Sequence, residues 1–226
     1  MQTSEKLSII KQEIDSLHVK LIAVSKTKTV GEILEAYNAG QRDFGENLVQ
    51  ELVEKAEQLP QDIIWHQIGH LQSNKVKYIA PFVSVIHSVD SLKILQEINK
   101  QALKNKRTID CLLQVHIAEE DTKYGLGYDE LIEILRSEEL KILRNIRIIG
   151  LMGIATNTKT ERVIKEEFYE LKTLFTGIKA SFFRTDEAFK EVSMGMSSDY
   201  KIAISQGSTM IRVGSLIFGN RPNLEA

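Results

Sequence analysis

The fold of this chain is first indicated by a short apolar run, KLIAVSK, at residues 20–26. In an extended strand its side chains alternate between two faces, and Ile22, Val24 and Lys26 share one of them. Apolar residues on both faces are typical of a strand in a parallel sheet that is covered on both sides. The run therefore predicts a buried strand that ends in a lysine.

Seven further short runs of this kind follow, separated by stretches with apolar residues at three- and four-residue steps, which predict helices. The predicted strands cover residues 20–26, 42–46, 63–69, 83–89, 110–117, 147–154, 192–196 and 210–218. The predicted helices cover residues 3–17, 33–38, 46–58, 91–106 and 161–175. Eight strands alternating with helices favour a single-domain (β/α)₈ TIM barrel over the alternative, an open doubly wound sheet. We expect one domain over residues 1–226, with an N-terminal helix over 1–18 and the barrel over 20–221.

Composition excludes several classes of function. The 226 residues carry a formal net charge of −2, which gives no electrostatic footprint for nucleic acid. The chain has neither an apolar run long enough to cross a membrane nor a start with signal-peptide architecture. Its one cysteine, Cys111, excludes an internal disulfide, suits a reducing compartment and is expected to be a small core residue. We therefore expect a cytoplasmic protein.

Lys26 is the first candidate for chemistry, because the C-terminal ends of barrel strands are where barrel active sites form. A lysine at an apolar strand end loses hydration, which lowers its pKa and supplies a neutral amine for attack on an aldehyde. The ordinary alternative is a lysine that leaves the strand and reaches solvent, and the pattern alone favours that alternative. Lys28, in the following loop, is expected to be solvated.

Two glycine- and serine-containing segments near the end of the chain predict an anion site. VSMGMSS at residues 192–198 is a strand running into a helix, and IRVGSLIFG at 211–219 is predicted as a strand with Gly214 and Ser215 near its centre. In barrels the loops after strands seven and eight commonly bind phosphate. Arg212 shares a face with Gly214 and could point into the barrel mouth, although an arginine paired with a rim carboxylate is the favoured interpretation from the residues alone.

The histidines do not predict a metal site. His66 and His70 lack the spacing and the glutamate of a zinc-protease helix, because His66 falls on a predicted strand and His70 beyond its end. His87 and His116 also fall on predicted strands, where a hydrogen-bonded core histidine is the commoner case. Dinucleotide, Walker-type and nucleophile-elbow motifs are all missing from the sequence.

Several ordered blocks along the chain resemble the pyridoxal phosphate homeostasis protein family, also called the proline synthetase co-transcribed family. The blocks are AVSKT (23–27), FGEN (44–47) with QE (50–51), IGHLQSNK (68–75), IHSVD (86–90), GLMG (150–153), SMGMS (193–197) and GSTMIRVG (207–214). The resemblance covers about residues 20–221. The chain is therefore similar to this family over nearly its whole length.

The resemblance implies a barrel of the alanine-racemase type (fold type III of pyridoxal phosphate proteins) without that enzyme's second domain. It also implies that Lys26 forms a Schiff base with pyridoxal 5′-phosphate. The other positions that match family cofactor-binding residues are Asn47, His66, Ser193, Gly195, Ser197, Arg212, Gly214 and Ser215. No residue is expected to bind metal.

Some positions depart from the family pattern. His116 stands where the family often has asparagine, and residues 118–121 (AEED) replace a loop that usually contains glycine. Lys123-Tyr-Gly125 then resembles the family's Lys-x-Gly segment. The departures put pocket details near strand five in doubt. The segment Phe182–Lys190, rich in charged and aromatic residues, has no explanation from the sequence.

Three functions remain open. The first is a non-catalytic carrier that holds pyridoxal phosphate as a Schiff base and supplies it to apo-enzymes, which the family resemblance implies. The second is a weak amino-acid racemase or lyase, which would need a second acid or base on the opposite ring face; in racemases of this fold part of that group comes from the second domain, which is not expected here. The third is an interaction barrel that binds phosphate incidentally. We expect a monomer, with the N-terminal helix packed on the barrel or on a partner.

Overall fold

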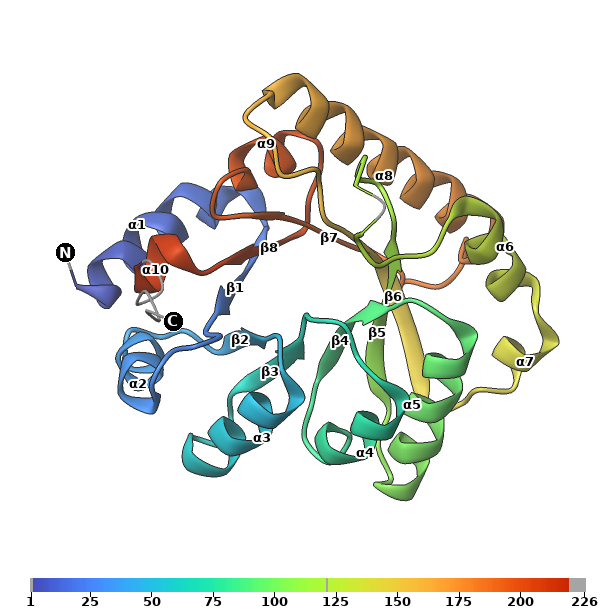
Figure 1. Cartoon of the computed structure of the whole chain (residues 1–226), viewed down its shortest axis with the longest axis horizontal. Helices are drawn as coiled ribbons and strands as arrows, with labels where there is room; N and C mark the ends of the chain where they lie inside the picture. The colour runs from blue at the N-terminus through green and yellow to red at the C-terminus, as the bar shows by residue number, and fades with distance from the viewer. Residues whose placement is uncertain (1, 121, 220–226) are drawn as a thin grey trace.

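The computed structural model describes residues 2–120 and 122–219. Eight parallel strands close into a barrel in chain order, with the first strand paired to the last. The strands are β1 (Lys20–Val24), β2 (Asp43–Glu46), β3 (Ile64–Gln67), β4 (Val85–Val89), β5 (Ile109–Val115), β6 (Ile146–Gly153), β7 (Glu191–Met196) and β8 (Met210–Val213). In Figure 1 they ring the centre of the molecule, and the helices surround them. The predicted (β/α)₈ barrel is confirmed.

Each gap between consecutive strands holds at least one helix. These helices are α2 (Val30–Asn38), α3 (Val49–Gln58), α4 (Val76–Ile79) after the 3₁₀ turn η2 (Ser73–Lys75), α5 (Leu92–Lys104), α6 (Tyr128–Arg136), α7 (Glu138–Lys141), α8 (Glu161–Phe182) and α9 (Tyr200–Ser205). Before β1 come α1 (Thr3–Ile14) and the 3₁₀ turn η1 (Asp15–Leu17), and α10 (Ser215–Phe218) follows β8. The sequence predicted a helix after residue 198, where α9 lies, but it missed α4, α6, α7 and α10.

The predicted strand over 210–218 is wrong in its second half, because β8 ends at Val213 and the chain turns into α10. Gly214 makes this turn where it passes β1 closely: a Cβ on it would lie 3.1 Å from the carbonyl oxygen of Val24. The amides of Ile217 and Phe218 then both donate to the Gly214 carbonyl. A continuous apolar run does not by itself distinguish strand from helix.

The N-terminal helix packs on the barrel. Its apolar residues Leu7, Ile10 and Ile14 are buried, and α1 lies against α2 and α10. Polar contacts fix it from both sides, since Lys11 donates to the carbonyl of Gly40 (2.9 Å) and Glu13 accepts from the hydroxyl of Tyr200 (2.6 Å). These contacts show that α1 packs on the barrel.

Strand alternation divides the apolar residues into two layers. One layer lies between the strands and the helices and includes Ala23, Phe44 and Leu52. The other fills the barrel interior and consists of Ile22, Val85, Leu112, Ile149, Met152 and Met210. Burying each large apolar side chain contributes on the order of 1.5–3 kcal/mol. Ile22 points inward, as the predicted parity requires for the face it shares with Val24 and Lys26.

The segment Phe182–Lys190 has a packing role that its composition did not reveal. Phe189 is fully buried and stacks on Phe183 (ring centroids 4.2 Å apart) and on Phe175 (5.0 Å). The aromatic residues thus anchor the end of α8 to the chain that enters β7. The end of the predicted barrel at residue 221 lies outside the described residues. Within the described ranges, no helix is both long and apolar enough to cross a membrane.

Candidate functional site

A pocket of about 690 Å³ opens at the C-terminal end of the barrel, where the loops after the strands converge. This volume is typical of small-molecule and cofactor sites. Six residues predicted for the site line it, namely Lys26, Asn47, Ser197, Arg212, Gly214 and Ser215. The remaining three, His66, Ser193 and Gly195, do not reach its surface and lie behind the wall. The pocket also has lining residues that were not predicted to bind a cofactor: Val24, Ile68, Gly69, His70, Gln114, Thr122, Tyr124, Ile154, Met196, Ser198 and Gly219, together with the lysines Lys28 and Lys123.

Lys26 lies in a tight turn just beyond β1. The strand ends at Val24, and the amide of Lys28 donates to the carbonyl of Ser25 across the turn (3.0 Å). Thr27 has a positive φ of 64°, which is unusual for a β-branched residue and costs on the order of 1–3 kcal/mol. The turn leaves Lys26 half-buried and facing the pocket. A strained backbone at this position requires other contacts to hold it.

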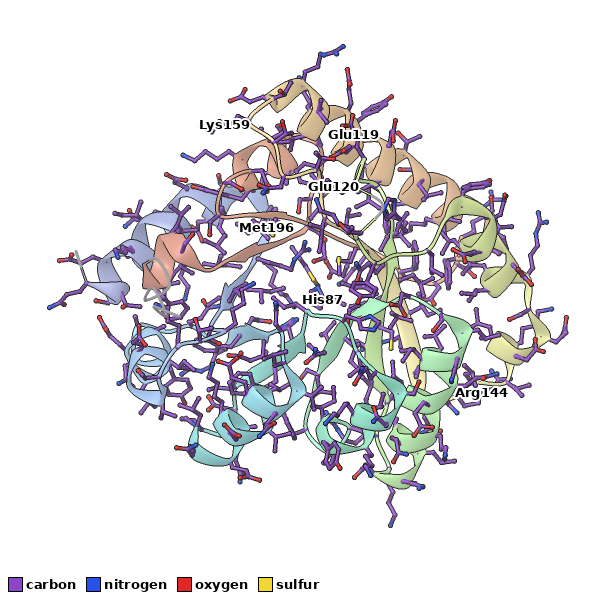
Figure 2. All side chains as sticks on the ribbon, viewed as in Figure 1. His87, Glu119, Glu120, Arg144, Lys159 and Met196 are labelled. Carbon is purple, nitrogen blue, oxygen red and sulfur yellow. The ribbon has the colours of Figure 1, made fainter. Side chains whose placement is uncertain are left out.

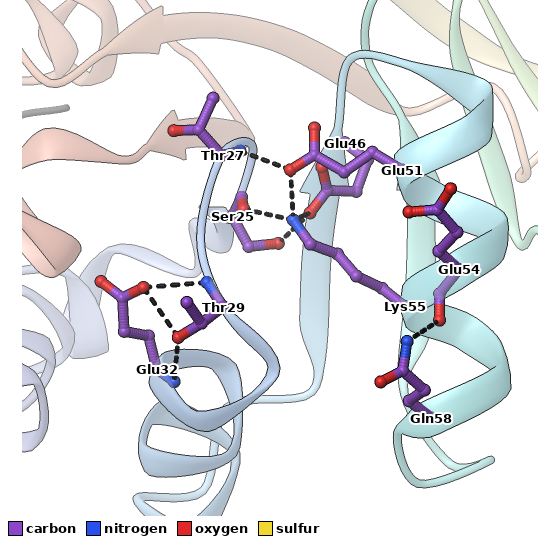
Figure 3. A network of polar contacts seen from close by, with 9 residues as sticks. All are labelled: Ser25, Thr27, Thr29, Glu32, Glu46, Glu51, Glu54, Lys55 and Gln58. Atoms are coloured by element: carbon purple, nitrogen blue, oxygen red, sulfur yellow. Dashed lines mark hydrogen bonds and ion pairs between the residues drawn. The ribbon is translucent and has the colours of Figure 1, made fainter. Parts of the chain in front are cut away.

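Those contacts come from a buried polar cluster between β1, β2 and α3, which we call the turn network (Figure 3). Glu46 Oε1 accepts from Ser25 Oγ (2.6 Å) and from Lys55 Nζ (2.7 Å). Lys55 also donates to the carbonyl of Ser25 (2.6 Å) and to Glu51 (2.7 Å). Glu51 in turn accepts from the amide of Thr27. Both neighbours of the pocket lysine are therefore tied to α3.

The carboxyl group of Glu46 is the most deeply buried member of the turn network. It is fully buried, and burial raises its pKa to about 7 against the opposing effects of Lys55 and Ser25. Its second oxygen, Oε2, has no hydrogen-bond partner among the described residues. Burying a charge is unfavourable even beside a partner, which explains the direction of the shift.

Two other lysines line the pocket, and carboxylates hold both. The expectation that Lys28 is solvated is wrong: its side chain is 9% exposed, and its Nζ lies 3.3 Å from Glu32 and donates to the carbonyl of Phe218. Lys123 Nζ lies 2.8 Å from Glu120 and donates to the carbonyl of Ala155 (2.6 Å). Both of these lysines therefore make ion pairs at the pocket wall.

The two glycine–serine segments meet in one wall of the pocket. The amide of Gly214 donates to Ser197 Oγ (3.1 Å), which joins the turn after β7 to the turn after β8. Gly195 supports this wall from behind: its φ is 97°, and a Cβ on it would lie 2.6 Å from the Cβ of Ala203 on α9. The hydroxyl groups of Ser197, Ser198 and Ser215 line this part of the pocket and can donate hydrogen bonds to an anion.

Beneath the pocket, five side chains form a hydrogen-bonded row inside the barrel, which we call the interior chain. Arg212 Nη1 donates to Ser193 Oγ (2.6 Å), which lies 3.0 Å from His87 Nδ1. His87 Nε2 lies 2.8 Å from His66 Nδ1, and His66 Nε2 lies 3.0 Å from Asp43 Oδ1. His87 lies within the ring of strands in Figure 2. The two histidines are hydrogen-bonded core residues, as the sequence favoured for His87.

Arg212 is the only member of the interior chain that lines the pocket, within the part of the chain that is described. Its second nitrogen, Nη2, donates to the carbonyl of Gly153 (3.0 Å). These partners are a hydroxyl and a carbonyl, so they do not match the rim carboxylate that the residues alone favoured. Burial lowers the pKa of Arg212 to about 10, which leaves the guanidinium charged at neutral pH.

The side of the pocket formed after β3 and β5 carries aromatic and amide groups that the sequence did not reveal. His70 and Tyr124 stack with their ring centroids 4.0 Å apart, and Asp90 lies 3.0 Å from His70 Nδ1. Gln114 donates to the carbonyl of Tyr124 (2.7 Å). The position of each residue at or beyond a strand end was the available signal, because barrel sites form at those ends.

The backbone of Asn47 packs closely against a neighbouring glycine. A Cβ on Gly69 would collide with the backbone of Asn47, so this close approach requires glycine. The carbonyl of Asn47 also accepts from the side chain of Gln67 (2.8 Å). The turns after β2 and β3 are therefore locked together at the pocket.

The loop after β5 carries the departures from the family pattern. His116 Nε2 lies 3.0 Å from the carbonyl of Glu120, and the amide of Glu119 donates to Thr156 Oγ1. Glu120 accepts from the amide of Asn157, and its contacts, chiefly the hydrogen bond from Lys123, lower its pKa to about 2. These residues fold the loop onto the chain after β6, while Asp121 lies outside the described residues.

Potential metal ligands do not gather in the described part of the chain, where no group of three histidine, cysteine or acidic residues could hold an ion. Cys111 is fully buried, as expected of a core residue, and burial raises the pKa of its thiol. The pocket chemistry therefore consists of lysine amines, hydroxyl groups, amides, an imidazole and a guanidinium.

Comparison with known proteins agrees with this fold. Residues 2–222 match the family described as alanine racemase, N-terminal domain. Among curated relatives, the chain is 42% identical over 208 residues to the pyridoxal phosphate homeostasis protein of Vibrio alginolyticus, covering 90% of this chain and 87% of that protein. It is 36% identical over 233 residues to the protein of the same name from Haemophilus influenzae, covering 98% and 97%.

Solved structures of similar proteins have the same fold. PipY of Synechococcus elongatus without pyridoxal phosphate superposes with a TM-score of 0.90 at 36% identity, covering 96% of this chain and 100% of that one. PipY with pyridoxal phosphate bound gives a TM-score of 0.87 at the same identity and coverage. Alanine racemase from Bartonella henselae, at 14% identity and a TM-score of 0.66, shares the fold.

Proposed function

The chain belongs to the pyridoxal phosphate homeostasis protein family, and we propose that it binds pyridoxal 5′-phosphate in the barrel-mouth pocket with Lys26 as the covalent anchor. We further propose that it supplies the cofactor to apo-enzymes. The observation that carries the proposal is the arrangement of one pocket: an amine on the turn after β1, a hydroxyl-and-glycine wall after β7 and β8, and a guanidinium on β8.

Lys26 is the pocket amine best suited to the aldehyde of the cofactor. It lies just beyond β1 in the AVSKT block at residues 23–27, and it lines the pocket. When neutral, the amine of Lys26 condenses with the aldehyde, so that a C=N bond forms and one water molecule leaves. The turn network fixes the backbone on both sides of Lys26 and reduces the entropy that is lost on binding.

The wall formed by Ser197, Gly214 and Ser215 suits the phosphate group. Its hydroxyl groups are hydrogen-bond donors, and its glycines allow backbone to approach an anion closely. In (β/α)₈ barrels the loops after strands seven and eight commonly serve this purpose. A third hydroxyl group, on Ser198, lies in the same wall.

Arg212 suits the pyridine nitrogen and favours a carrier over an enzyme. It stays protonated at neutral pH and can only donate hydrogen bonds, so a ring nitrogen facing it remains an unprotonated acceptor. An unprotonated ring is a weaker electron sink for carbanion chemistry. Asn47 lines the same pocket, whereas His66 and Ser193 act through the interior chain.

A Schiff base is reversible, which suits storage and delivery. Hydrolysis or exchange with another amine, such as the active-site lysine of an apo-enzyme, returns the amine of Lys26 and transfers the aldehyde. The reducing compartment suggested by the single cysteine supports action in the cytoplasm. We propose that the unit of function is the monomer, which light scattering at working concentrations would test.

Absorption spectroscopy tests the anchor. We expect purified protein incubated with pyridoxal phosphate to show the visible band of a protonated Schiff base. Lys26→Met should abolish the band, whereas Lys28→Met and Lys123→Met should retain it. Retention of the full covalent adduct in Lys26→Met would refute the assignment.

Two assays separate a carrier from an enzyme. Loaded protein should restore activity to a defined apo-enzyme, and loaded Lys26→Met should do so no better than free cofactor at the same concentration. Incubation with L- and D-amino acids in deuterated water should leave the α-proton in place. Rapid exchange of that proton would favour racemase or lyase chemistry and contradict the carrier role.

A further inference from the structure

The interior chain connects the pocket to the other end of the barrel without using a charged residue between its ends. Its members are Asp43 on β2, His66 on β3, His87 on β4, Ser193 on β7 and Arg212 on β8. The three central residues are fully buried, and Arg212 is 4% exposed. Each contact is 3.0 Å or shorter, so every hydrogen atom in the row needs a defined position.

The two end members of the interior chain set the direction of its hydrogen bonds. Arg212 can only donate, and an ionised Asp43 can only accept. Ser193 Oγ accepts from Arg212, so its single hydrogen is free to point to Nδ1 of His87. In that arrangement His87 Nε2–H donates to His66 Nδ1, and His66 Nε2–H donates to Asp43.

This direction uses every hydrogen once and leaves both histidines neutral with the hydrogen on Nε2. Adding one proton to His66 reverses the central bonds: His66 Nδ1–H would donate to His87 Nε2, and His87 Nδ1–H would donate to Ser193. The Ser193 oxygen would then accept twice, and its own hydrogen would lose its acceptor in the row. Buried hydroxyl groups without partners are unfavourable.

The surroundings favour the neutral arrangement. Burial lowers the pKa of His66, against the hydrogen bond and charge of Asp43 and the charge of Asp110, while Lys20 lowers it further. Burial lowers the pKa of His87 well below its ordinary value, and the charges of His66, Arg212 and Lys20 act in the same direction. Both rings are therefore neutral at pH 7.

We propose that Asp43, His66, His87 and Ser193 are positioning residues that form a one-way hydrogen-bond chain, which fixes the guanidinium of Arg212 against the pyridine ring of the cofactor. The inference rests on the proposed function, because it takes Arg212 to face that ring. Ser193 holds Nη1 and the carbonyl of Gly153 holds Nη2, so the remaining guanidinium surface is presented to the pocket. Through the interior chain, the orientation of the guanidinium depends on the carboxylate of Asp43, which does not line the pocket.

The first test is a measurement of the histidine tautomers in the cofactor-free protein. Long-range ¹H–¹⁵N correlation spectra of protein labelled at its five histidines distinguish Nδ1–H, Nε2–H and doubly protonated rings. His66→Gln and His87→Gln assign the two buried signals. We expect both rings to be neutral Nε2–H tautomers at pH 7.5. A hydrogen on Nδ1 of either ring would overturn the one-way chain, whatever the cofactor does.

The second test asks whether a remote change reaches the cofactor. Asp43→Asn introduces a donor at the accepting end, and Ser193→Ala removes the link to Arg212. We expect Ser193→Ala to lose affinity for pyridoxal phosphate on the order of tenfold, as for a lost hydrogen bond to a charged group. Asp43→Asn should lose affinity several-fold. Both variants should shift the visible absorption band.

Asp110→Asn is the matched control. Asp110 has a similar side-chain exposure to Asp43 (23% and 18%) and also acts on His66 through its charge, but its hydrogen bonds go to Arg147. We expect it to keep the wild-type affinity and spectrum, even if its melting temperature falls. Wild-type affinity and spectrum in Asp43→Asn and Ser193→Ala would overturn the positioning role while leaving the Lys26 anchor intact. If Lys26→Met instead keeps the full covalent adduct, the proposed anchor fails, and the tautomer measurement still decides whether the one-way interior chain exists.

Discussion

The two sides of the pocket are held by two buried polar clusters of opposite character. The turn network beside Lys26 is ionic and lies between the barrel wall and α3, where Lys55 contacts both Glu46 and Glu51. The interior chain beneath Arg212 has charges only at its ends and passes through two neutral histidines inside the barrel. One cluster stabilises a strained backbone turn, and the other orients a side chain. Ion pairs therefore fix the backbone on one side of the pocket. On the other side, hydrogen bonds between neutral histidines fix the position of a guanidinium.

The two clusters also respond to pH in opposite directions. The pKa of Glu46 is raised to about 7 from 4.5, so its contribution to the free energy of unfolding is fully present below pH 4.5 and is lost as pH rises to 7. The pKa values of His66 and His87 are lowered from 6.5. Their contribution is present above pH 6.5 and is lost as pH falls below that value.

The largest expected effect comes from breaking the ionic side. Glu46→Ala leaves Lys55 buried without its deepest partner, which should reduce the free energy of unfolding by about 3–5 kcal/mol. The loosened turn should also weaken cofactor binding. Urea unfolding measures the first effect, and titration with pyridoxal phosphate measures the second.

Glu54→Ala on the same helix is the control, because Glu54 is exposed and lies outside the turn network (Figure 3). We expect its stability to stay within about 0.5 kcal/mol of the wild type. Equal losses in the two variants would mean that the ion pair does not hold the turn.

Breaking the neutral side should cost less. His87→Leu leaves His66 Nδ1 and Ser193 Oγ without a shared partner, which should destabilise the protein by about 1–3 kcal/mol. Chemical denaturation measures the loss, with His116→Gln as a control at a half-buried loop position. A stability equal to the wild type would show that the buried row contributes nothing to folding.

A pH series sharpens the comparison between the clusters. As pH falls from 7 to 5, the stability of wild type relative to Glu46→Gln should rise by up to about 1.4 kcal/mol per pH unit. Over the range below pH 6.5, the stability of wild type relative to His87→Gln should instead fall by a similar amount. Unfolding curves at several pH values test both slopes, and slopes of the same sign would contradict the account.

The smallest expected effect concerns the strained turn itself. Thr27→Gly removes the penalty of a positive φ and adds chain entropy to the unfolded state, so stability should rise by no more than about 1 kcal/mol. Thermal unfolding measures the change. A loss of more than that amount would mean that the Thr27 side chain, and not only its backbone, holds the turn.

The sequence predicted the fold because each strand is encoded locally, as a short apolar run between helical stretches. It also brought Lys26 and the segments around Ser197 and Gly214 to one place, since all of them follow strand ends in a barrel. The predicted C-terminal end of β8 was wrong because the apolar run continues into α10 without a change in composition. The burial of Lys28 was not predicted because its contact with the carbonyl of Phe218 joins residues 190 positions apart.

Neither polar cluster could be read from the sequence. Ser25 and Glu46 lie 21 residues apart, and His87 and Ser193 lie 106 apart. Alternation tells which face of a strand a side chain occupies, but closure of the barrel decides which inward residues meet. Lys55 looks in sequence like any lysine on a helix surface, and only the packing of α3 against β2 buries it.

The central claim, that Lys26 anchors the cofactor, is tested most directly by chemical trapping. Protein loaded with pyridoxal phosphate is reduced with borohydride, which converts a Schiff base to a stable secondary amine, and the modified peptide is identified by mass spectrometry. We predict that the label is on Lys26 and that Lys28 and Lys123 are unmodified at one cofactor per chain. A label on either of those two lysines, or none at all, would contradict the account.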